Sequence, residues 1–166
     1  MSLDNIQLTP FLLHELFKKS LIELDVSESY QQMSPASSFT MLGNNRKRII
    51  IFVANDETLY LPDEQLNFLL GILSACSLTM EDVAIINIKK NKNITYKAIE
   101  LELKGEIIIL FGVTPAQINM PIEFPHYQVQ SFNSQTYLAA PMLPEIQDNK
   151  MEKTKLWNCL KKIFAT

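Results

Sequence analysis

The feature that most constrains the fold of this chain is the apolar run Ile-Ile-Ile-Phe-Val-Ala at residues 49–54. Charged residues precede it at 46–48, and the polar residues Asn55, Asp56 and Glu57 follow it. A strand with one face in water alternates polar and apolar side chains, whereas this run is continuous and rich in β-branched residues. We therefore expect a strand that is covered on both faces.

Similar runs recur at residues 83–88 and 107–111, and helical patterns lie between them. The pattern at 63–76 is clear, whereas residues 95–104 carry features of both a strand and a helix, and the order of elements favours a helix. Alternation at 127–132 predicts a fourth strand near a sheet edge, and residues 150–164 predict a final helix. This order predicts an α/β fold: a three-layer α/β/α sandwich around a mainly parallel four-stranded sheet.

The N-terminal 42 residues differ from the rest of the chain. Residues 8–24 predict an amphipathic helix, and residues 25–39 resemble a linker because they lack apolar periodicity. We expect the helix and linker to occupy residues 1–42 and the α/β domain to occupy residues 43–166. The helix either packs on its own domain or enters a groove on a partner. In the second case the anchors are Leu12, Leu13, Leu16 and Phe17.

Composition narrows the class of protein. A net charge of −3 over 166 residues argues against a surface that holds duplex DNA unaided. No apolar run is long enough to span a bilayer, and the N-terminus lacks the pattern of a secretion signal. Cys76 and Cys159 are expected to be buried free thiols. We therefore expect a cytoplasmic protein without membrane contact.

Few residues carry a recognisable chemistry. His14 and His126 have no ligand partners at metal spacing, and we predict no metal site and no cofactor. Acidic residues gather near the end of the first strand at 56–57 and 63–64, where they suit helix capping better than general-base catalysis. Lys89, Lys90 and Lys92 form a basic loop that is either simply solvated or makes weak nucleic-acid contacts.

Several segments resemble the uracil-DNA glycosylase-like superfamily in their order. The relevant segments are Asp-Val-Ala-Ile-Ile-Asn at 82–87, Leu-Phe-Gly at 110–112 and Lys-Thr-Lys-Leu-Trp at 153–157. The resemblance implies the fold of that superfamily. The chain departs from it at both catalytic loops, where residues 54–58 contain no glycine and residues 138–142 contain no histidine. We therefore predict no catalytic residues.

Two segments are similar to the psi-subunit family of the bacterial DNA polymerase III clamp-loader complex: Val-Ala-Asn-Asp at 53–56 and Ala-Ala-Pro-Met-Leu-Pro-Glu-Ile at 139–146. This resemblance implies a non-catalytic subunit whose N-terminal helix binds clamp-loader or other replisome proteins. Positions inherited from a degenerate active site are then Asn55, Asp56, Glu57, Asn87 and Pro141. Two alternatives stay open: a divergent uracil-DNA glycosylase-like DNA repair enzyme that uses Asp56 or Glu57, and a protein whose N-terminal helix completes its own core.

Overall fold

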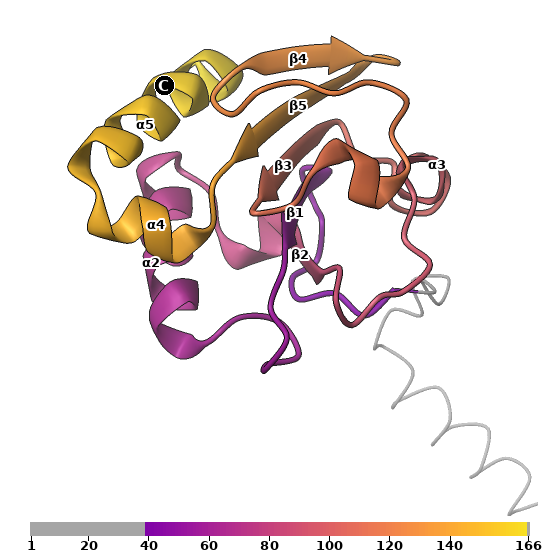
Figure 1. Ribbon diagram of the computed structural model, residues 1–166, viewed down its shortest axis with the longest axis horizontal. Helices are drawn as coiled ribbons and strands as arrows, with labels where there is room; N and C mark the ends of the chain where they lie inside the picture. Colours follow the sequence, from indigo (N-terminus) through magenta and orange to yellow (C-terminus); the bar gives the residue numbers. More distant parts are fainter. Residues whose placement is uncertain (1–38, 166) are drawn as a thin grey trace, which may run out of the picture. The chain divides into compact units, whose positions relative to one another are not determined.

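The computed structural model describes residues 39–165, which form an α/β domain around one five-stranded sheet (Figure 1). The strand order is β2-β1-β3-β5-β4. Neighbouring strands are parallel except β4, which runs antiparallel to β5 at the sheet edge. The strands are β1 (Ile49–Val53), β2 (Val83–Asn87), β3 (Ile107–Phe111), β4 (Val129–Phe132) and β5 (Gln135–Ala140).

Helices cover both faces of the sheet, so the described domain has three layers (Figure 1). One face packs against α2 (Asp63–Ala75), α4 (Leu143–Asp148) and α5 (Lys150–Phe164). The other face packs against α3 (Tyr96–Ala98), a π-helical turn (Ile99–Leu103) and a 3₁₀ turn (Pro115–Ile118). A further 3₁₀ turn (Met80–Asp82) leads into β2.

The expectation of strands covered on both faces is confirmed. Every residue of β1 and β2 is buried, and alternate side chains of β1 enter different cores. Ile49, Ile51 and Val53 belong to the α2–α5 core, whereas Ile50 and Phe52 belong to the opposite core. A continuous apolar strand therefore stabilises two layers at once. The predicted helices at 63–76, 95–104 and 150–164 are also present.

The prediction of a four-stranded sheet is wrong, because residues 135–140 form β5 between β3 and β4. Residues 138–140 therefore lie in a strand and not in a loop. Asn133 and Ser134 both have positive φ, at 51° and 62°, which suits a tight hairpin between β4 and β5. The helical segment at 96–103 ends with Lys104 in the left-handed conformation, one residue before Gly105.

The proposed partner anchors Leu12, Leu13, Leu16 and Phe17 lie outside the described residues. The domain already includes residues just before position 43, because Phe39 is buried in one core and Leu42 pairs with Ile85 of β2. Among residues 39–165, no helix combines the length and apolar character needed to cross a membrane.

Candidate functional site

The carboxyl ends of the parallel strands meet at one edge of the sheet, where α/β folds usually carry their ligand sites. Val53 of β1 is in register with Asn87 of β2 and with Phe111 of β3. Phe111 is in register with Ala140, the residue before Pro141. The positions predicted from the sequence therefore lie along the same edge, although Pro141 follows β5, two strands away from β1.

Asn87 is fully buried and binds the loop that follows β1. Its side-chain amide donates to the carbonyl oxygens of Asn55 (2.7 Å) and Thr58 (3.0 Å). Its side-chain oxygen accepts hydrogen bonds from the backbone N–H groups of Asn55 and Lys89, both at 3.1 Å. Both donor hydrogens and the acceptor oxygen of this amide are used, so Asn87 acts as a structural clamp.

Asn55 organises the same loop from the other side. Its side-chain oxygen accepts hydrogen bonds from the N–H groups of Glu57 (3.0 Å) and Thr58 (2.8 Å). Asp56 is exposed and is held by the basic loop: Lys90 donates to its carbonyl oxygen (2.9 Å), and the Lys89 ammonium lies 3.8 Å from its carboxylate. Two of the three loop lysines therefore contact the protein itself.

The space at this edge is small. A hollow of about 60 Å³ is lined by residues that include Ala54, Asn55 and residues 142–144, whereas ligand pockets usually measure about 300 Å³ or more. Gly112 has a positive φ of 64°, and a side-chain carbon at that position would lie 2.5 Å from Cγ of Met142. Met142 thus packs over the end of β3 beside this hollow.

The acidic side chains near this edge are exposed. Glu57, like Asp56, is exposed, and so is His126, which lies in the loop before β4. No group of three or more His, Cys, Asp or Glu side chains within residues 39–165 is arranged to hold a metal ion. The hydrogen bonds at this edge hold the loop after β1, and the acidic residues of that loop face solvent.

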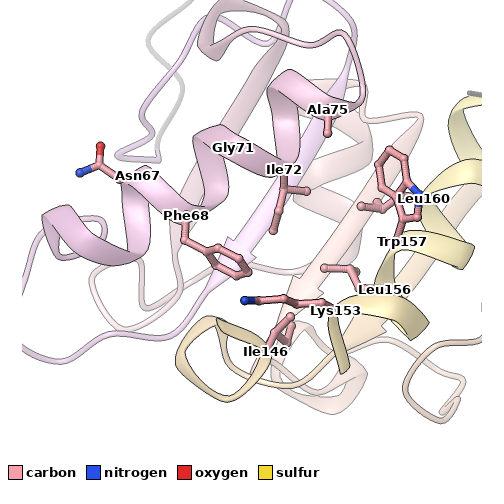
Figure 2. Close-up of a pocket in the computed structure, with 10 residues that line it drawn as sticks. All are labelled: Asn67, Phe68, Gly71, Ile72, Ala75, Ile146, Lys153, Leu156, Trp157 and Leu160. Atoms are coloured by element: carbon pink, nitrogen blue, oxygen red, sulfur yellow. The ribbon is translucent and has the colours of Figure 1, made fainter. Parts of the chain in front are cut away.

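A second candidate site is an open apolar groove of about 440 Å³ on the helical layer formed by α2, α4 and α5 (Figure 2). Phe68 and Ile72 of α2 point toward Leu156 and Trp157 of α5 (Figure 2). Gly71, on α2 between them, adds no side chain. The full lining is Asn67, Phe68, Gly71, Ile72, Ala75, Ile146, Lys153, Leu156, Trp157 and Leu160.

Lysines border the groove on the α5 side. The Lys153 ammonium lies 5.7 Å from the centroid of the Phe68 ring, and that of Lys161 lies 5.6 Å from the Trp157 ring. Such cation–π contacts hold the ammonium groups beside the apolar surface. The groove was not predicted, because its residues follow the same helical spacing as core residues and the sequence does not show which of them are left uncovered.

The opposite side of α5 is closed by polar contacts with the loop before β4. The Tyr127 hydroxyl donates to the Glu152 carboxylate at 2.6 Å, and Lys155 pairs with Glu152 at 2.7 Å. The bonds from Lys155 and Tyr127 lower the pKa of Glu152, and burial raises the pKa of the Cys159 thiol. Cys159 and Cys76 are both buried and free, which confirms the expectation for the thiols.

Comparison with known proteins adds no family assignment. No protein-family model matches the chain, and no curated protein matches it.

Proposed function

We propose that this protein is a non-catalytic interaction subunit that resembles the psi subunits of bacterial clamp-loader complexes and binds a replication protein through residues 8–24. The observation that carries this proposal is the Asn87 clamp. In a glycosylase-like enzyme, the loop after the first strand must approach a nucleobase and activate water. Here the corresponding loop is engaged in hydrogen bonds with Asn87.

Two further features support an interaction role over catalysis. The hollow at the carboxyl edge, at about 60 Å³, is much smaller than the roughly 300 Å³ of a typical small-molecule pocket. The larger concave surface of the helical layer is apolar, which is the character of a protein-binding surface.

The test is a pull-down from a lysate of the source cell with the full-length protein beside the double variant Leu13→Asp/Phe17→Asp. We expect clamp-loader subunits with the full-length protein and their loss with the variant. A charge placed on the apolar face of an amphipathic helix opposes its burial in a groove.

The double variant must have the same thermal unfolding midpoint as the wild type. Loss of binding then reports on the helix and not on folding. A variant of the predicted polar face, Lys18→Asp, serves as the matched control and is expected to retain the partner. Recovery of no replication protein by the full-length chain contradicts the proposal. Release of uracil from uracil-containing DNA by the pure protein supports the repair enzyme instead.

A further inference from the structure

The groove formed by α2, α4 and α5 contains a glycine that the described domain does not require. Gly71 lies in the middle of the 13-residue helix α2 and has no positive φ. A side-chain carbon built at this position meets no atom within 4 Å. Glycine inside a helix costs about 0.5–1 kcal/mol relative to alanine. Neither backbone conformation nor packing within the described domain accounts for this cost.

The position of Gly71 suggests why a glycine is present there. It lies at the surface of α2 among Phe68, Ile72 and Ala75, so its bare backbone forms part of the wall of the groove (Figure 2). A glycine at such a place allows the backbone of a second element to approach closely. An apolar groove of this kind is the usual receptor for the apolar face of an amphipathic helix.

The charges at the groove specify the chemistry of that helix. Helix α5 contains five lysines and one glutamate, and the glutamate already pairs with Lys155. Within residues 39–165 neither Lys153 nor Lys161 forms an ion pair. Acidic residues of α2 are confined to its first turn, where Glu64 accepts a hydrogen bond from Gln147 (3.1 Å). The available positive charges therefore favour acidic residues on the bound helix.

We propose that this groove binds an acidic amphipathic helix of a partner protein, with the apolar stripe of that helix over Gly71 and its carboxylates beside Lys153 and Lys161. These lysines are eight residues apart on α5, or about 12 Å along the axis, so the groove accommodates about two turns of the partner helix. A second copy of this chain is a poorer occupant, because groove-to-groove pairing brings two lysine-rich α5 helices together.

The inference deepens the proposed interaction role by adding a second contact surface on the α/β domain. The two proposals fail separately. The pull-down reports on residues 8–24, whereas the groove is tested with purified protein and a synthetic peptide and needs no replication partner.

Trp157 is the only tryptophan of the chain and lines the groove, so its fluorescence reports on occupancy. The probe is a tryptophan-free helical peptide with leucines at i, i+3, i+4 and i+7 and glutamates on both sides of this stripe. A second peptide carries lysines in place of the glutamates. Titration of the full-length protein with the glutamate peptide is expected to shift the Trp157 emission to shorter wavelength, and the lysine peptide is expected to bind at least tenfold more weakly.

Gly71→Leu fills the groove from its α2 wall and is expected to weaken the glutamate peptide at least tenfold while the protein stays folded. The matched control is Asn158→Leu, which adds the same side chain at an exposed position of α5 that does not line the groove. This control is expected to bind normally. Lys153→Glu and Lys161→Glu are each expected to weaken the glutamate peptide about twofold to fivefold, as for exposed ion pairs, and to strengthen the lysine peptide.

Three results overturn the proposal. The first is a lack of specific binding: either the glutamate peptide shows no saturable binding, or the Gly71→Leu variant binds it as tightly as the wild type does. The second is a change of oligomeric state in Gly71→Leu, which assigns the groove to a second copy. The third is a shift of Trp157 emission by Leu13→Asp/Phe17→Asp without any peptide, which assigns the groove to the N-terminal segment of this chain.

Discussion

At the carboxyl edge of the sheet, Asn87 is fully buried and its side chain forms four hydrogen bonds, whereas in the groove of the helical layer Phe68 and Trp157 are only part-buried. The edge is the place where ligands are expected in this class of fold, yet the buried Asn87 side chain there already has its hydrogen-bond partners within the domain. In the groove, the apolar side chains of Phe68 and Trp157 are only part-buried. The ammonium groups of Lys153 and Lys161 form no ion pair within residues 39–165. The two regions therefore differ in their contacts: the buried amide at the edge is engaged within the domain, whereas the aromatic side chains of the groove stay partly exposed.

The largest expected effect tests the edge. Replacing Asn87 with leucine keeps the side-chain size but removes four hydrogen bonds and leaves backbone groups of Asn55, Thr58 and Lys89 without this partner. We expect the free energy of unfolding to fall by about 3 kcal/mol, as measured by urea denaturation. Asn93→Leu, at an exposed position of the following loop, is the control. A loss below about 1 kcal/mol would mean that the clamp is not structural.

Asn55 gives a smaller effect at the same edge. Its side-chain oxygen accepts from the N–H groups of Glu57 and Thr58, so Asn55→Ala is expected to destabilise the protein by about 1 kcal/mol. Asn55→Asp keeps an acceptor oxygen and is expected to lose less. Denaturation of both variants beside the wild type measures the difference, and a larger loss for the aspartate than for the alanine contradicts this role.

In the groove, a substitution is expected to raise the free energy of unfolding, whereas the substitutions at the edge lower it. Gly71→Ala restores an ordinary helix residue in open space, and we expect a gain of about 0.5–1 kcal/mol in the free energy of unfolding. Calorimetry or urea denaturation of the protein without a partner measures this gain. A loss of stability would show that the domain itself needs the glycine, and the comparison between the two regions would then fail.

The smallest effect concerns pH and the far side of α5. Hydrogen bonds from Lys155 and Tyr127 lower the pKa of Glu152 below its usual 4.5. A carboxyl with a lowered folded-state pKa stabilises the protein above 4.5 and loses this contribution as the pH falls through the folded-state value. We expect the wild type to lose a small stability advantage over Glu152→Gln below pH 4.5. Denaturation of both proteins at several pH values measures this difference in the free energy of unfolding. A difference that stays constant as the pH falls would contradict the role given to Glu152.

Much of the fold was predictable because its signals are local. The runs at 49–54, 83–88 and 107–111 are continuous and β-branched, and each is a buried strand in the structure. Strand β5 was missed because Gln-Thr-Tyr-Leu-Ala-Ala at 135–140 contains few β-branched residues and precedes a proline, and its pairing with β3 connects distant segments.

The sequence by itself determined the class of fold, because strand and helix patterns depend on residues that are close together in the chain. The apolar faces of these elements are buried only when the elements pack in layers. The sequence also placed Asn55 directly after the first strand and Asn87 near the end of the second. Only the tertiary structure decided their roles, since the hydrogen bonds between them join residues 32 positions apart. The same holds for the groove: a helical stripe specifies which residues are apolar, whereas the packing of neighbouring helices decides which of them stay uncovered.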